Sequence, residues 1–117
     1  MTLGAKQRLF ARLLPKLLDH IHSQGYECAM AEGYVGLSID KPTEDTPHLR
    51  SGGHFHKLAQ DLDLFQFSAS TLQFEYLTTT EAHQPFGEYW ESLHELCRWG
   101  GRFGDGNHYS LVHDGIA

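Results

Sequence analysis

Residues 5–24 most constrain the fold, because they predict a long helix with a single apolar side. The apolar side chains that recur at helical spacing are Leu9, Phe10, Leu13, Leu14, Leu17, Leu18 and Ile21. A stripe of this length must be covered by a second layer, so we expect the helix to pack on a core. We also expect Pro15 to kink the helix or to start a second one, and Gly25 to end it.

Four further segments predict strands, at residues 26–39, 57–67, 72–79 and 108–113. In the second of these, alternation places leucines on one face of the strand, at Leu58, Leu62 and Leu64. The other face carries small, acidic and aromatic residues, at Ala59, Asp61, Asp63 and Phe65. The second and third segments are expected to pair as a hairpin.

A second helix is predicted over residues 81–96, with Thr79 or Thr80 as its N-cap. Its inner face would consist of Phe86, Tyr89, Trp90, Leu93 and Leu96. Residues 40–53, with two prolines and two glycines, predict a loop, and residues 98–107 predict a glycine-rich turn. This order predicts the α+β class, with a small antiparallel sheet and flanking helices in a single domain over 1–117.

Composition narrows the class of partner. The net charge is −6 and no block of Lys or Arg occurs, so we expect no nucleic-acid partner. No run approaches the roughly 18 apolar residues that a membrane span needs, so no membrane insertion is expected. Cys28 and Cys97 lie far apart and are expected to be reduced thiols. We expect a monomer.

The N-terminal segment does not resemble a signal peptide. Lys6, Arg8, Arg12 and Lys16 interrupt its apolar residues, and no apolar core follows a basic start. We therefore expect a chain made in the cytoplasm without a signal peptide.

Nine histidines raise the prospect of a metal site. His54 precedes Asp61 by seven residues, an odd separation that would put the two side chains on opposite faces of a straight strand. His54 would therefore have to approach from a turned-back loop, for which Gly52 and Gly53 give the backbone freedom. We interpret His54 and Asp61 as candidate ligands of a catalytic metal, which takes about three protein ligands.

A second polar pair, Asp105 and His108, precedes the last predicted strand. Glycines flank Asp105, so its carboxylate can be aimed. If the last strand pairs beside the second, His108 and Asp61 can converge. Asp105 would then lie near the metal without binding it and could take a proton from the attacking water.

Spacing alone leaves alternatives open. His-x6-Asp and Asp-x2-His are both common by chance, and loop histidines that bind nothing are the more frequent case. A shifted site on His56 and Asp63 has the same spacing. The other histidines show no partner pattern and are expected at the surface or beside helices; they are His20, His22, His48, His83, His94 and His113.

The ordered pair His-x6-Asp and Asp-x2-His-aromatic resembles the zinc-dependent D,D-carboxypeptidase and L-alanyl-D-glutamate endopeptidase family. The first motif covers His54, Ala59, Asp61 and Leu62 within "HFHKLAQDLDLF". The second covers Trp99, Gly100, Gly101, Arg102, Asp105, His108 and Tyr109 within "WGGRFGDGNHY". "KQRLFARLL" and "YLTTTEAHQPFGEYWESL" are also similar to segments of small phage-encoded members, so the resemblance spans nearly the whole chain.

The resemblance implies a hedgehog/DD-peptidase-like fold and a zinc ion held by His54, Asp61 and His108. It implies that Asp105 is the general base and later the proton donor. It also implies a substrate that contains D-amino acids, the stem peptide of peptidoglycan.

Two departures from the family pattern concern small and basic residues. Members usually carry Ser two residues before the first His, where this chain has Gly52 and has Ser51 one residue earlier. Members often carry Glu-x-x-Arg upstream; Glu32 is present here, but Val35 occupies the Arg position. Arg50 could substitute from the loop, so Glu32 and Arg50 are candidate substrate-binding residues.

Trp99 and Tyr109 could form the floor of the substrate cleft or could pack in the core. The expected function is hydrolysis of a cell-wall peptide bond by an endolysin-like enzyme, which acts after release or is carried in a phage particle. The alternative is a non-catalytic zinc-binding module of the same fold that acts in protein interaction or phage assembly.

Overall fold

The computed structural model of the chain describes residues 1–31 and 56–117. In chain order the elements are α1 (Leu3–Ser23), β1 (Tyr26–Met30), β2 (Ala59–Ser68), β3 (Gln73–Leu77), α3 (Thr80–Leu93), β4 (Cys97–Trp99), the 3-10 helix η1 (Gly100–Phe103) and β5 (His108–Leu111). The predicted α+β class, with two helices and a small antiparallel sheet, is confirmed for these residues. No helix in the described ranges is long and apolar enough to cross a membrane.

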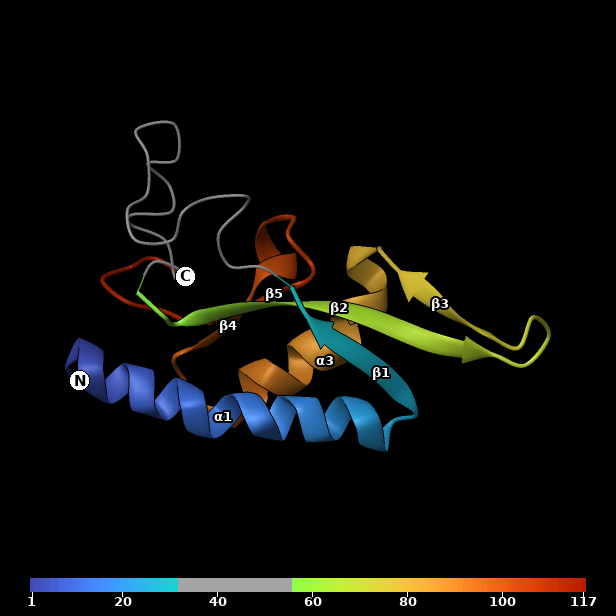
Figure 1. Ribbon diagram of the computed structural model, residues 1–117. Helices are drawn as coiled ribbons and strands as arrows, with labels where there is room; N and C mark the ends of the chain where they lie inside the picture. The colour runs from blue at the N-terminus through green and yellow to red at the C-terminus, as the bar shows by residue number, and fades with distance from the viewer. Residues whose placement is uncertain (32–55) are drawn as a thin grey trace, which may run out of the picture.

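The sheet is organised around β2, its longest strand (Figure 1). The strand order is β1-β2-β5-β4, and β3 also pairs with β2. Every pairing is antiparallel. The predicted hairpin of the second and third segments is confirmed, and the last strand does pair beside the second.

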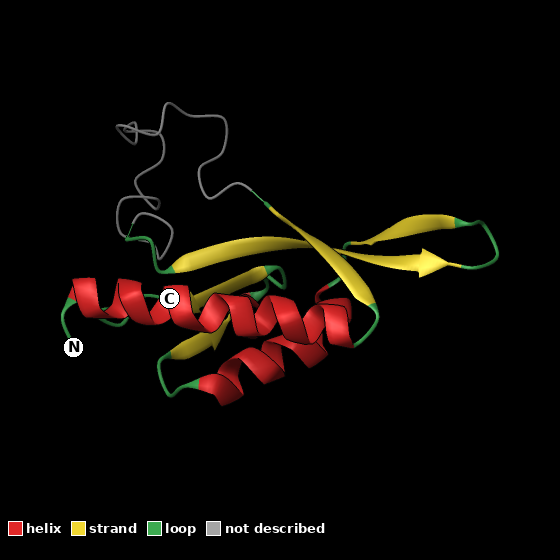
Figure 2. Cartoon of the chain, turned by 60° about the horizontal axis from the view of Figure 1, so that its bottom comes forward, coloured by secondary structure: helices red, strands yellow, loops and turns green. Residues whose placement is uncertain are grey.

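Both helices cover the same face of the sheet (Figure 2). Leu58, Leu62 and Leu64 are completely buried there, as the alternation predicted. The first helix buries Phe10, Leu13, Leu17 and Ile21 from the predicted stripe, and α3 buries Phe86 and Trp90. Full burial of a large apolar side chain stabilises a fold by about 1.5–3 kcal/mol, so this layer is the main source of stability.

The first helix runs unbroken through Pro15, so the prediction that a second helix starts there was wrong. Pro15 is on the exposed side of α1, where water can satisfy the carbonyl that loses its helical hydrogen bond. The buried stripe meanwhile holds both halves of the helix against one layer. The predicted end is confirmed: Gln24 is the C-cap, and Gly25 follows with a φ of +87°.

The remaining boundaries differ from the predictions in two places. The first strand ends at Met30, and the rest of its predicted range lies outside the described residues. The second helix ends at Leu93, because His94 is extended and its Nδ1 accepts a hydrogen bond from the backbone N–H of Leu96. The short edge strand β4 begins directly after that turn, and three residues are too few to show a strand pattern in sequence.

The indole of Trp99 packs against the backbones of two glycines. A Cβ atom at either Gly87 of α3 or Gly101 of η1 would overlap this ring. The carboxylate of Glu91 accepts one hydrogen bond from the Trp99 backbone N–H and two from the Arg102 guanidinium. These contacts fix the segment after β4 against α3.

His83 was expected at the surface or beside a helix, and the structure shows that it is buried. It is 3 % exposed, and its Nδ1 shares a 2.8 Å hydrogen bond with the Tyr109 hydroxyl. Burial lowers its pKa below the ordinary value, although the carboxylate of Asp63 acts in the opposite direction. His83 is therefore neutral at pH 7 in the folded protein.

The two cysteines are free, as predicted. Cys97 is buried and Cys28 is half-buried. Burial raises the pKa of Cys97 to about 12, and burial also raises that of Cys28, with a smaller contribution from the charge of Glu27. Both groups are therefore protonated and poorly nucleophilic near pH 7.

Replacement of Gly87 by Ala should destabilise the protein, because the added methyl group overlaps the Trp99 ring. Overpacking of a buried site costs about 1–3 kcal/mol. Gly4→Ala is the matched control, because its methyl group meets only the flexible Arg8 side chain, at 3.5 Å. Both positions are helical and Ala has the higher helix propensity, so propensity cannot lower the Tm of either variant; thermal unfolding should show a lower Tm for Gly87→Ala alone. Equal Tm values would contradict the packing described for Trp99.

The buried His83 should make the folded protein less stable at acid pH. Its pKa is lower in the folded chain than in the unfolded chain, so the unfolded chain binds the proton first as pH falls below about 6.5. The wild type should therefore lose part of its stability advantage over His83→Gln between pH 7.5 and pH 5.5, measured by urea unfolding. A gap between wild type and His83→Gln that stays constant would contradict the assignment.

Candidate metal centre

The pairing of β2 with β5 places Asp61 directly opposite His108. Residues opposite each other in an antiparallel pair project from the same face, so the carboxylate and the imidazole meet. That face is the one turned away from the helices, because Leu62 and Tyr109, the next residues on each strand, are buried in the core. The predicted convergence of Asp61 and His108 is confirmed.

Asp105 reaches the same place from the turn between η1 and β5. Its backbone N–H donates to the carbonyl of Gly100 at 2.8 Å, and its own carbonyl accepts from the His108 N–H at 3.2 Å. Gly104 supplies the left-handed backbone conformation that this turn requires, with a φ of +83°. A Cβ at Gly100 would overlap the Asp105 carbonyl, so only glycine allows the turn to close this tightly.

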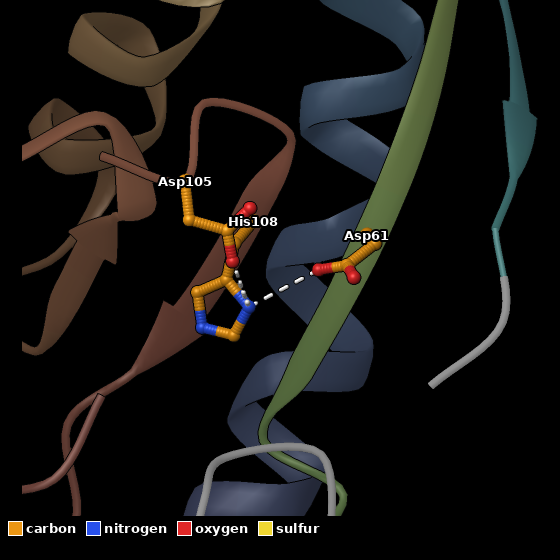
Figure 3. Close-up of side chains that lie close together, drawn as sticks. All are labelled: Asp61, Asp105 and His108. Atoms are coloured by element: carbon orange, nitrogen blue, oxygen red, sulfur yellow. Dashed lines mark hydrogen bonds and ion pairs between the residues drawn. The ribbon is translucent and has the colours of Figure 1, made fainter. Parts of the chain in front are cut away.

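The three side chains lie around one point, and the His108 imidazole interacts with both carboxylates (Figure 3). His108 Nδ1 lies 3.1 Å from Asp61 Oδ1 and 4.0 Å from Asp105 Oδ2. One ligand atom from each residue can be chosen so that all lie within 4.8 Å of one another. The group could therefore hold a metal ion.

The distances distinguish the two carboxylates. Two ligands bound at about 2.0–2.1 Å in a tetrahedron lie about 3.3 Å apart, close to the spacing of His108 and Asp61. The spacing of His108 and Asp105 is longer. The side chain of Asp105 is also 52 % exposed, compared with 22 % for Asp61 and 7 % for His108. This geometry fits Asp61 and His108 as ligands and Asp105 as a neighbouring carboxylate that solvent can reach.

Three predicted site residues cannot be placed. His54, Glu32 and Arg50 lie outside the described residues. The shifted site on His56 and Asp63 receives no support. Within residues 1–31 and 56–117, the side chains placed to hold a metal ion together are Asp61, Asp105 and His108.

Trp99 and Tyr109 are core residues. They are 3 % and 0 % exposed, and Tyr109 packs edge-on against Trp90. Trp99 also holds the turn beside the site, because its Nε1–H donates to the carbonyl of Gly106 at 2.7 Å. Of the two interpretations, core packing is the one this burial favours, and contact with a substrate stays a prediction.

A polar pocket of about 240 Å³ lies beside the three residues and has Asp105 in its wall. Its other walls come from β2, β3, the first turns of α3 and the turn before β5. Sequence analysis did not identify this pocket. The one available signal was the alternation in β2, which places Asp63 on the same face as Asp61.

No family model, no curated protein and no solved structure matches this chain.

Divalent transition metals should bind to this group, because imidazole favours them over Mg²⁺. We expect His108→Ala and Asp61→Ala each to weaken Zn²⁺ binding by more than about tenfold in isothermal titration calorimetry. Asp105→Ala should weaken Zn²⁺ binding much less. Asp114→Ala, at an exposed position, is the control. A large loss in Asp105→Ala would instead make Asp105 a ligand, and unchanged binding in all variants would exclude the site.

Proposed function

We propose that this protein is a zinc metallopeptidase that hydrolyses a peptide bond in the stem peptides of bacterial peptidoglycan. The observation that carries the proposal is the convergence of one buried imidazole and two carboxylates, one of which is open to solvent. A site that only binds metal for stability has little use for an exposed carboxylate beside its ligands.

The ligand set in this proposal is His54, Asp61 and His108. Asp61 and His108 come from paired strands, which gives them fixed positions. His54 precedes β2 in the chain and would supply the third donor. Two imidazoles and one carboxylate form a donor set that is typical of catalytic zinc sites. A zinc ion in such a site supplies Lewis-acid chemistry, which polarises a carbonyl group and acidifies water.

Asp105 is the proposed proton carrier. Its exposed carboxylate lies 4.0 Å from His108 Nδ1, on a turn that two backbone hydrogen bonds and the Trp99 indole hold in place. A carboxylate in this position can take the proton from the attacking water and deliver it to the amine that leaves. The bond between the carbonyl carbon and the amide nitrogen breaks as the amine departs.

The choice of substrate rests on the resemblance of the two motifs to the D,D-carboxypeptidase and L-alanyl-D-glutamate endopeptidase family. On this proposal the domain has the hedgehog/DD-peptidase fold and acts on the cell wall, either after release from the cell or from within a phage particle. The small antiparallel sheet with both helices on one face is compatible with that fold. With Val35 in place of the usual Arg, Arg50 is the candidate basic residue for substrate binding.

The proposal is tested with purified protein and purified peptidoglycan. We expect soluble peptide release that chelation with EDTA abolishes and that added Zn²⁺ restores. Asp105→Ala should lower the rate by about 10²–10⁴-fold, the range of general acid–base catalysis, while Zn²⁺ remains bound. Glu95→Ala, a carboxylate removed from an exposed position, is the control. Zinc binding without any hydrolysis by the wild type would favour the non-catalytic zinc module.

A further inference from the structure

The pocket beside Asp105 has the chemistry of a binding site for a cation. Apart from His83, the polar residues that the structure describes in its wall are Asp63, Tyr76, Thr78, Thr80, Asp105 and Asn107. Two of these side chains are carboxylates, and no Lys or Arg is among the described lining residues. The remaining polar groups are hydroxyls and an amide, which can accept hydrogen bonds from a cationic donor without adding positive charge.

Asp63 is the carboxylate that the metal centre does not use. Its Oδ1 accepts a hydrogen bond from the Tyr76 hydroxyl at 2.9 Å, which fixes the direction of the side chain. Within the described part of the chain, no Lys, Arg or His forms an ion pair with Asp63. A carboxylate that is oriented, half-buried and without a cation nearby is suited to a charge that arrives with a ligand.

His83 gives a second, independent indication of a ligand. This side chain is only 3 % exposed, and it belongs to the pocket wall. Its Nδ1 bonds to the Tyr109 hydroxyl, and no other hydrogen bond of His83 is found among the described residues. The second ring nitrogen makes no hydrogen bond among the described residues, and it can accept one from a cationic donor in the tautomer whose Nδ1–H donates to the Tyr109 hydroxyl. Burial lowers the pKa of His83, so the ring brings no positive charge.

Among the described parts of the wall, the start of α3 is a feature that attracts anions. A helix N-terminus is equivalent to about half a positive charge. Here the Thr79 side chain already accepts a hydrogen bond from the N–H of Ala82, and Glu81 lies in the first turn. The carboxylate of Asp63, which the Tyr76 hydroxyl orients, outweighs what remains, so the pocket favours a cation over a carboxylate.

Size and position relate the pocket to the substrate. Sites for whole small-molecule ligands measure about 300–1,000 Å³, so 240 Å³ suits one side chain. Asp61 and Asp63 are two residues apart on one face of β2, which separates them by about 7 Å. A side chain in the pocket would thus belong to a residue next to the bond that is cut.

We propose that the pocket formed around Asp63, Tyr76 and His83 binds the primary ammonium of a lysine-like diamino acid that neighbours the scissile bond. This inference rests on the proposed function, because it assigns the pocket to the same peptide substrate. A flexible four-carbon stem that ends in three donors matches a narrow pocket lined by acceptors. Asp63 acts here as a substrate-binding residue and takes no part in the chemistry.

The test compares two stem peptides that differ only in lysine, which is free in one and Nε-acetylated in the other. We expect the wild-type protein with Zn²⁺ to cleave the free-lysine peptide with a kcat/KM about ten- to a hundredfold higher. Asp63→Asn should lose this preference, with the loss confined to the free-lysine peptide. Tyr76→Phe should reduce the preference less, because the carboxylate remains.

The charge-matched control is Glu75→Gln. It removes one carboxylate from an exposed position on β3, the strand that carries Tyr76, and should keep the preference for free lysine. A third peptide with an amidated C-terminus tests the alternative of a carboxylate in the pocket. Equal rates for free and acetylated lysine, or a preference that depends on the terminal carboxylate, would overturn the inference.

Binding separates this inference from the proposed function. Chemical-shift titration of the zinc-loaded wild-type protein with a non-cleavable analogue of each peptide reports on the pocket without turnover. If no peptide is cleaved by the wild type, the proposed function is wrong, and the pocket assignment to a substrate is overturned with it. If cleavage occurs but His83 and Asp63 signals respond equally to both peptides, only the pocket assignment is wrong.

Discussion

The register between β2 and β5 is the constraint on which the candidate site depends. Asp61 and His108 are separated by 46 intervening positions in sequence and meet only because their strands pair at that point. A slip of one residue would turn Asp61 toward the helices and bring Leu62 to the metal face. The burial of Leu58, Leu62 and Leu64 opposes such a slip, since it would expose all three side chains. The hydrophobic core therefore sets the geometry of the polar site on the other face.

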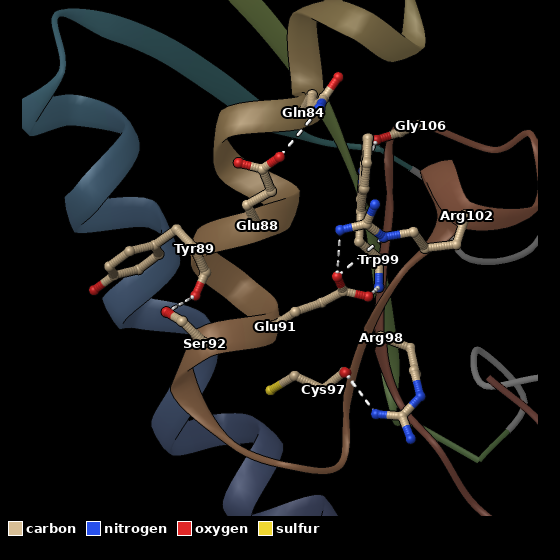
Figure 4. A network of polar contacts seen from close by, with 10 residues as sticks. All are labelled: Gln84, Glu88, Tyr89, Glu91, Ser92, Cys97, Arg98, Trp99, Arg102 and Gly106. Atoms are coloured by element: carbon tan, nitrogen blue, oxygen red, sulfur yellow. Dashed lines mark hydrogen bonds and ion pairs between the residues drawn. The ribbon is translucent and has the colours of Figure 1, made fainter.

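A second constraint concerns Asp105, which lies on a turn. Trp99 connects this turn to the body of the protein through its indole N–H, and Gly87 and Gly101 provide the space in which the ring sits. Glu91 then ties the Trp99 backbone and the Arg102 guanidinium to α3 (Figure 4). Trp99 is thus a positioning residue: its burial holds the carboxylate that would move protons, although it has little surface to offer a ligand.

The sheet separates stability from chemistry. One face is covered by α1 and α3 and contains the buried apolar side chains (Figure 2). The opposite face carries Asp61, His108 and Asp63, all from strands that the apolar face holds in register. The metal group contains Asp61 and the pocket contains Asp63. These residues are two positions apart on β2, so the pocket and the metal group are adjacent. The metal ligand Asp61 and the proposed substrate-binding residue Asp63 therefore share one strand, β2.

Local pattern in the sequence determined the elements with strong periodicity. The stripe along α1 and the alternation in β2 follow from burial of one side, so residue spacing alone predicted them. The same alternation predicted that Asp61 faces away from the leucines. Sequence could not predict β4, which is too short to show a period, or the end of α3, which depends on the ring of His94.

Tertiary structure decided everything that needed strands to be placed side by side. The sequence predicted that Asp61, Asp105 and His108 come together only if the last strand pairs beside the second. The pairing of β5 with β2 brings them together. His83 was expected at the surface because a histidine on a helix carries no sign of its partner, which comes from Tyr109 on a distant strand. The pocket beside Asp105 could likewise not be predicted from the sequence, because its walls come from four separate segments. Periodicity reports which side of an element is buried, whereas only the fold determines which elements meet.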